Sequence, residues 1–94
     1  MLIRIVKMSF DPEKIEDFKA LFAEVQPVIK DFSGCHHVEM CIDAKSPNIM
    51  YTFSKWEDEA DLENYRSSEF FESTWAKTKV LFNGKPEAYS LITS

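Results

Sequence analysis

The chain has 94 residues, of which 45% are hydrophobic and only two are glycine. This length and composition predict a single folded domain over residues 1–94, and they exclude a disordered chain or a disulfide-based scaffold. Eleven Lys and Arg against sixteen Asp and Glu give 11 − 16 = −5. The basic residues are scattered along the chain, which excludes the basic surface that nucleic acids require.

The first ten residues and the two cysteines bear on where the protein works. MLIRIVKMSF is interrupted by Arg4 and Lys7 and is followed by no small-residue cleavage site. We therefore expect neither a signal peptide nor a membrane span, and a cytoplasmic protein. Cys35 and Cys41 would lie about 20 Å apart along one extended strand, too far for a disulfide, so we expect free thiols.

The first half of the chain predicts a strand followed by a long helix. Residues 2–10 are rich in β-branched and other apolar side chains, which would cover both faces of the strand. Asp11 as N-cap and Pro12 at the first helical position begin the helix, and Ser33-Gly34 ends it. Its apolar stripe consists of Ile15, Phe18, Leu21, Phe22, Val25, Ile29 and Phe32. Pro27 predicts a kink or break near Gln26.

The second half predicts two strands, two helices and a last strand. The strands are residues 35–43 and 49–56, joined by the turn KSPN. A helix over residues 57–66 is separated by the cap Ser67-Ser68 from a helix over 69–82, which Asn83-Gly84 closes. The apolar stripe of that helix consists of Phe71, Trp75, Thr78 and Phe82. Residues 86–94, PEAYSLITS, predict the final strand.

The order of these elements predicts an α+β fold. A β-α-β-β-α-β chain forms the ferredoxin-like arrangement, an antiparallel sheet with its helices on one face. The strands carry apolar side chains on both sides, so the face without helices also needs cover. The same face of a second copy, related by a two-fold axis, is the simplest cover and predicts a homodimer.

The stretch GCHHVEMCID, residues 34–43, has the composition of a metal site but not its geometry. Alternation along a strand places Cys35, His37, Glu39 and Cys41 on one face and His36, Val38, Met40 and Ile42 on the other. The two histidines therefore cannot coordinate one ion together. The chain has no second cluster of histidines and cysteines to supply the three or four ligands that zinc takes. We expect no metal, with histidines that line a pocket or the dimer seam, where one could carry a proton.

Several short motifs resemble the antibiotic biosynthesis monooxygenase family. These motifs are Gly34-Cys35 at a strand start, Asp43 and Pro47 around a turn, Trp56 before Glu57-Asp58, and Ser67 with Phe70. The resemblance implies a dimeric α/β barrel with a small apolar pocket in each subunit. It also implies, as in some members, oxygenation of a small phenol or quinol-like aromatic by molecular oxygen without a metal or other cofactor.

On this resemblance the candidate catalytic residues are Tyr65, His37 and His36. Many members carry a histidine where this chain has Tyr65, so Tyr65 would donate a hydrogen bond to the substrate oxygen and His37 or His36 would accept the proton. Trp56, Phe71 and Trp75 would be the apolar walls that bind the substrate. Each of these aromatic residues is also a reasonable core residue.

Two other functions fit the same scaffold. One is a non-catalytic dimeric module that binds a small ligand in the pocket. The other is a muconolactone-isomerase-like enzyme acting on an acidic lactone, for which Arg66 is the candidate cation. The haem-degrading branch of the superfamily fits less well, because its members use an Asn on the first strand and this chain has none there.

Overall fold

The computed structural model describes residues 1–93 and shows the predicted α+β fold. The described residues form strands β1 (Leu2–Ser9), β2 (Cys35–Ile42), β3 (Ile49–Trp56) and β4 (Glu87–Ile92), helices α1 (Ile15–Lys30), α2 (Glu59–Arg66) and α3 (Glu69–Lys79), and a short 3₁₀ turn, η1 (Pro12–Lys14). The predicted order of elements is confirmed. Ser94, the last residue of the predicted final strand, lies outside the described residues.

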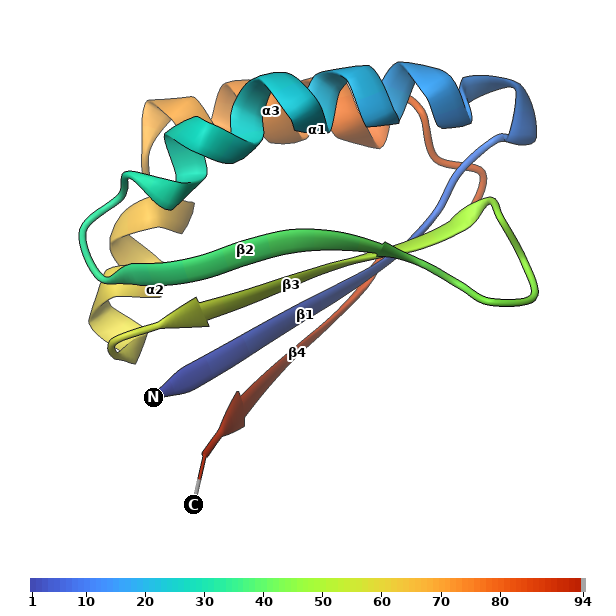
Figure 1. Ribbon diagram of the computed structural model, residues 1–94. Coiled ribbons are helices and arrows are strands. Elements are labelled where there is room, and N and C mark those ends of the chain that lie inside the picture. Colours follow the sequence, from blue (N-terminus) through green and yellow to red (C-terminus); the bar gives the residue numbers. More distant parts are fainter. Residues whose placement is uncertain (94) are drawn as a thin grey trace.

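The strands form an antiparallel sheet in the order β2-β3-β1-β4. Helices α1 and α3 lie side by side over one face of this sheet, and α2 lies at the end where the two chain termini also are (Figure 1). The opposite face carries no helix among residues 1–93. This two-layer arrangement is the predicted ferredoxin-like topology.

Side-chain caps set where the helices begin. Asp11 accepts a hydrogen bond from the amide of Glu13 and opens η1, which leads directly into α1. Asp58 caps α2, so that helix begins two residues later than predicted. Ser68 caps α3. None of the helices within residues 1–93 has the length and apolarity needed to cross a membrane.

Pro27 does not divide the long helix. Helix α1 continues through it as one element to Lys30. Pro27 is exposed, so the carbonyl that loses its amide partner at this point can be hydrated instead. The side-chain amide of Gln26 donates to the carbonyl of Val38 on β2 at 3.2 Å and ties this part of α1 to the sheet.

The core lies between the helices and the sheet in two adjoining clusters. One surrounds Trp56, at the α2 end of the sheet, and includes Leu2, Val25, Ile29, Cys35, Val38 and Leu62. The other, at the far end, contains Met8, Phe10, Phe18 and Met50. Trp56, Phe10, Met8 and Met50 are the largest fully buried side chains. The helix-facing side of the central strands β1 and β3 therefore supplies three of these four largest buried side chains, Trp56, Met8 and Met50.

A register shift at the start of β2 corrects the predicted faces of that strand. Cys35 pairs with Trp56 while His37 pairs with Lys55, so one extra residue is accommodated between them. Such a bulge reverses the alternation on one side of it. Cys35 consequently joins Val38 in the core, and the prediction that it shares a face with His37 and Cys41 was wrong. Both cysteines are free, as predicted.

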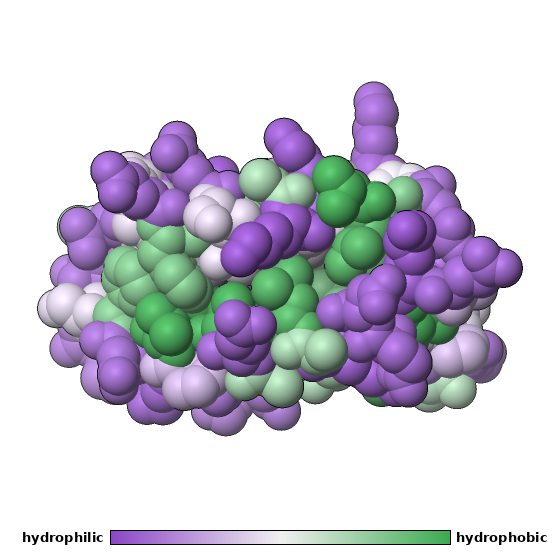
Figure 2. Space-filling view, turned by 90° about the horizontal axis from the view of Figure 1, so that it is seen from above, coloured by the Kyte–Doolittle hydropathy of each residue, from purple (hydrophilic) through white to green (hydrophobic). Residues whose placement is uncertain are grey.

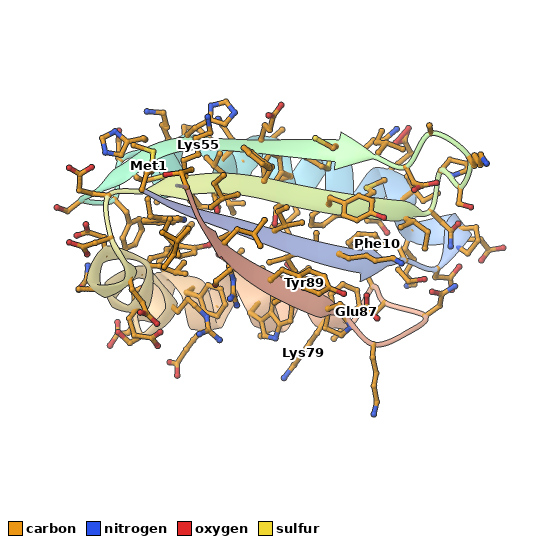
Figure 3. All side chains as sticks on the ribbon, turned by 90° about the horizontal axis from the view of Figure 1, so that it is seen from below. Met1, Phe10, Lys55, Lys79, Glu87 and Tyr89 are labelled. Carbon is orange, nitrogen blue, oxygen red and sulfur yellow. The ribbon has the colours of Figure 1, made fainter. Side chains whose placement is uncertain are left out.

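The face of the sheet opposite the helices is also apolar. Its cross-strand neighbours include Ile5 between Phe53 and Tyr89, and Ile3 beside Leu91. Figure 3 views the molecule from this side, with the sheet in front of the helices and Tyr89 on the strand nearest the viewer. Tyr89 and Leu91 are each 49% exposed. We name this surface, formed by Ile3, Ile5, Tyr51, Phe53, Tyr89 and Leu91, the open face.

Candidate functional site

A cavity of about 270 Å³ lies between the sheet and the helices. All four strands contribute to its floor, and all three helices contribute to its walls. Most of its lining is apolar, as in Val6, Met8, Phe22, Leu62 and Trp75. Seen from the helix side, apolar atoms gather along the middle of the molecule between hydrophilic margins (Figure 2). The volume is slightly below the range of roughly 300–1,000 Å³ typical of small-molecule sites.

Tyr65 is packed among aromatic rings at one end of the cavity. Its ring stacks on Trp56 with centroids 5.2 Å apart, and it meets Phe32 and Phe71 edge to face at 5.0 and 5.2 Å. Burial, followed by the nearby thiol of Cys35, raises the pKa of Tyr65 well above its ordinary value. Its hydroxyl therefore stays protonated at neutral pH and can act as a hydrogen-bond donor.

The junction of α2 and α3 holds Tyr65 in place. Leu62, one turn earlier on α2, is buried in the core and orients that short helix. The hydroxyl of Ser68 lies 2.6 Å from the carbonyl of Tyr65, and it also accepts the amide of Phe71 at 3.1 Å. One serine thus connects the end of α2 to the start of α3. The broken helix is what aims Tyr65 and Phe71 at the same space.

The predicted substrate-binding residues line the cavity together. Trp56, Phe71 and Trp75 all contribute to its wall, as does Tyr65. The rings of Phe71 and Trp75 are nearly parallel, with an interplanar angle of 8° and centroids 6.0 Å apart. Trp56 is almost fully buried, and its indole N–H donates to the hydroxyl of Ser54 at 3.0 Å. The structure therefore brings these four predicted residues to one site.

Neither histidine lines this cavity. His36 pairs with Glu57 at 2.8 Å on an exposed edge of the molecule. His37 lies 3.1 Å from Glu39, and its ring contacts Phe53 on the open face. The structure does not bring His36 or His37 to Tyr65, because the bulge and the alternation of β2 direct both side chains away from the helices.

Both arginine side chains reach the cavity, but only Arg66 was predicted as a candidate site residue, as the cation of the isomerase alternative. Arg4 on β1 and Arg66 at the end of α2 both line it. Arg4 donates to the hydroxyl of Ser90 on β4 at 2.9 Å. Its pKa is lowered by burial and then by the charge of Arg66, with Glu63 acting in the opposite direction. The sequence signal that could have identified Arg4 is its position as a charged residue on the same face of β1 as the apolar Leu2 and Val6.

Within the described residues, the lining of the cavity offers hydrogen-bond donors but no side chain that would ordinarily act as a general base. Among residues 1–93, the cavity wall contains no carboxylate and no imidazole. Its polar side-chain groups are the two guanidinium groups, the Tyr65 phenol, the indole N–H groups of Trp56 and Trp75, and the hydroxyls of Thr52, Ser54, Thr74 and Thr78. The described part of the chain has no group of three or more residues placed to hold a metal ion. The site can bind and polarise an oxygen atom, but it offers no ordinary proton acceptor.

Comparisons with known proteins agree with the fold. The model of the family described as antibiotic biosynthesis monooxygenase matches residues 1–77. A crystal structure of an antibiotic biosynthesis monooxygenase has a TM-score of 0.92 and 19% identity, covering 100% of this chain and 99% of that one. A conserved protein from Methanosarcina mazei Go1 has a TM-score of 0.93 and 21% identity, covering 100% of this chain and 94% of that one. A protein from Pseudomonas aeruginosa has a TM-score of 0.86 and 18% identity, covering 99% of this chain and 93% of that one. No curated protein matches the chain.

Proposed function

This chain belongs to the antibiotic biosynthesis monooxygenase family, and from that premise we propose that it is a cofactor-independent monooxygenase acting on a small phenol or quinol-like aromatic. The observation that supports this most is the aromatic cavity around Tyr65, whose phenol is the buried donor described above. A flat substrate would lie against Phe71 and Trp75 with its oxygen toward Tyr65. Packing of this kind orients the substrate and excludes water.

The proposed reaction needs no reductant other than the substrate. A phenol and one O₂ give a quinone and one water. One oxygen atom bonds to a ring carbon, and the other leaves as water with the ring hydrogen and the phenolic hydrogen. The substrate supplies all of the electrons, beginning with transfer from its phenolate to O₂. Tyr65 would stabilise the phenolate oxygen by donating a hydrogen bond to it.

The missing base distinguishes this function from the isomerase alternative. An isomerase must remove a proton from carbon and return it elsewhere, which requires a positioned acceptor. The cavity lining within residues 1–93 contains none. A phenol whose pKa is lowered by the nearby positive charges can instead ionise to solvent before it binds or as it binds. We therefore place His36 and His37 outside the proposed catalytic machinery.

Oxygen consumption tests the proposal directly. The purified protein is incubated with a panel of hydroquinones and naphthols in an oxygen electrode, and products are analysed for one atom of labelled oxygen. Tyr65→Phe is expected to lower the rate by roughly 10- to 100-fold, the effect of one hydrogen bond to a charged group. Tyr51→Phe, which removes the same hydroxyl from the open face, is the matched control.

Two outcomes of this assay would argue against a monooxygenase. If no substrate gives uptake above a protein-free blank, the proposal fails. If ligands raise the melting temperature without any uptake, the non-catalytic binding module becomes the better description. A rate that is equal in Tyr65→Phe and wild type would remove Tyr65 from the mechanism.

The proposed assembly is a homodimer with two cavities. The open face would pack against the same face of a second copy and complete the dimeric barrel. Its support is chemical: Ile3, Ile5, Phe53 and Leu91 place a row of apolar side chains on a sheet surface that no helix covers among residues 1–93. No residue of this face lines the cavity, so each subunit would hold a complete site.

A further inference from the structure

Both arginines of the chain line the cavity. The sequence contains eleven basic residues, and only Arg4 and Arg66 are arginine. None of the lysines contributes to the cavity wall, and within residues 1–93 no Asp or Glu does either. A protein with a net charge of −5 thus places two positive charges, and no negative one, around its main apolar hollow. Guanidinium groups suit planar oxyanions better than ammonium groups do, because their N–H donors form a rigid fork.

The two guanidinium groups are only partly neutralised by the protein. Arg4 bonds the neutral hydroxyl of Ser90, and none of the described carboxylates lies within 4.0 Å of it. Arg66 meets Glu63 at 3.5 Å, a long contact in which the Glu63 side chain is 65% exposed. Burial and the charge of Arg66 lower the pKa of Arg4. The site therefore carries unfavourable positive charge that a bound anion would relieve.

We propose that Arg4 and Arg66 form an anion-binding end of the cavity that selects small aromatic carboxylates. The carboxylate would lie between the two guanidinium groups, and the ring would extend into the apolar part beside Phe71 and Trp75. The hollow of about 270 Å³ suits a ligand of one or two fused rings. This inference deepens the proposed function by naming the substrate class as a hydroxylated aromatic acid, and it rests on that function for the reaction that follows binding.

Exposed lining residues indicate where the charged end opens to solvent. Arg66, Pro86 and Ala88 are exposed, whereas the other residues around the cavity are buried or half-buried. The entrance therefore lies between the end of α2 and strand β4, next to the Arg4–Ser90 contact. A carboxylate at this position keeps part of its hydration while its ring is desolvated. Such an arrangement binds an amphipathic acid in one orientation.

Equilibrium binding of matched probes tests this inference without any turnover. Naphthoate and its uncharged counterpart naphthamide are titrated into the intact protein by calorimetry, at low and at high salt. We expect naphthoate to bind at least about tenfold more tightly than naphthamide. The preference should shrink at high salt because the site is open at its charged end. Equal affinities for the two probes would overturn the proposal.

Substitutions of Arg4 and Arg66 test whether these residues cause the preference for naphthoate over naphthamide. Arg4→Gln and Arg66→Gln should each weaken naphthoate binding by about tenfold or more and leave naphthamide within about twofold. Glu63→Gln should tighten naphthoate binding, since Glu63 competes for Arg66. Lys79→Gln is the charge-matched control, and its side chain extends from α3 into solvent (Figure 3). A loss in Lys79→Gln as large as in the arginine variants would reduce the effect to net charge and reject the site.

The same measurements separate this inference from the proposed function. Carboxylate-selective binding without oxygen uptake would keep the anion site and reject the monooxygenase. Oxygen uptake with neutral naphthols that is unchanged in both arginine variants, together with equal affinity for the two probes, would keep the monooxygenase and reject the anion site. Arg66 is largely on the surface, so its variant remains informative even if Arg4→Gln impairs folding.

Discussion

The ring of Tyr65 lies against the indole of Trp56 at a centroid distance of 5.2 Å and an angle of 23°. The contact joins a core residue that is 1% exposed, Trp56, to the half-buried Tyr65, and both side chains line the cavity. A change at Trp56 should therefore disturb both stability and ligand binding. A change further along the wall should affect mainly binding.

The two tryptophans allow these effects to be separated. Trp56→Ala should lower the free energy of unfolding by about 3–5 kcal/mol, since it leaves a large void beneath Tyr65 and removes the indole donor to the Ser54 hydroxyl. Trp75→Ala should cost less, because Trp75 is only half-buried, but it should enlarge the cavity and weaken aromatic ligands. Urea unfolding measures the first effect and calorimetric titration the second. Equal destabilisation by the two substitutions would contradict this ranking.

The buried phenol predicts a specific weakness at alkaline pH. Burial raises the pKa of Tyr65 above its ordinary value, whereas in the unfolded chain it ionises at about pH 10. Its contribution to stability is therefore fully present below that pH and is lost as the pH rises above it. The unfolding free energy should fall by up to about 1.4 kcal/mol per pH unit more steeply in wild type than in Tyr65→Phe. Urea titrations across this range measure it, and parallel pH profiles would be the opposing result.

The parts of the fold that follow local rules could be predicted from the sequence. Asp11 and Ser68 are N-caps of the kind expected from their side chains, and the apolar stripe of α1 identified a helix that packs on a sheet. Strand β3 matches its predicted bounds. In these segments propensity, capping and periodicity agree, which is the condition under which local patterns determine structure.

The parts that depend on pairing between distant strands could not be predicted. Alternation alone placed Cys35 with His37, but the register shift against β3 separates them. A bulge of this kind depends on how two strands meet, and one strand's sequence does not reveal it. The cavity role of Arg4 depends likewise on where Ser90 and Arg66 lie. Phe71 and Trp75 were identifiable as cavity walls because they share one stripe of α3, whereas the charged end is assembled from three separate elements.

Gly34 should be the glycine that cannot be replaced. Its φ of +81° lies in the left-handed region, and a Cβ there would collide with the side chain of Asp61 on α2. Gly34→Ala should therefore destabilise the protein by about 1–3 kcal/mol. Gly84→Ala, where a Cβ would meet Ser9 at an ordinary 3.5 Å, is the matched control and should be neutral or slightly stabilising. Thermal unfolding compares them, and similar effects at both sites would refute the argument.

The last prediction concerns the proposed burial of the open face in a homodimer. Phe53→Asp places a charge at the middle of that face, opposite Ile5, so it should convert the proposed homodimer to a monomer because a buried unpaired charge costs several kcal/mol. Val80→Asp, at a site 69% exposed beyond the end of α3, adds the same charge away from the face and should leave the dimer intact. Sedimentation equilibrium measures both masses. A monomeric wild-type protein at micromolar concentration would reject the dimer, and the half-buried Ile5 and Phe53 would then require another partner.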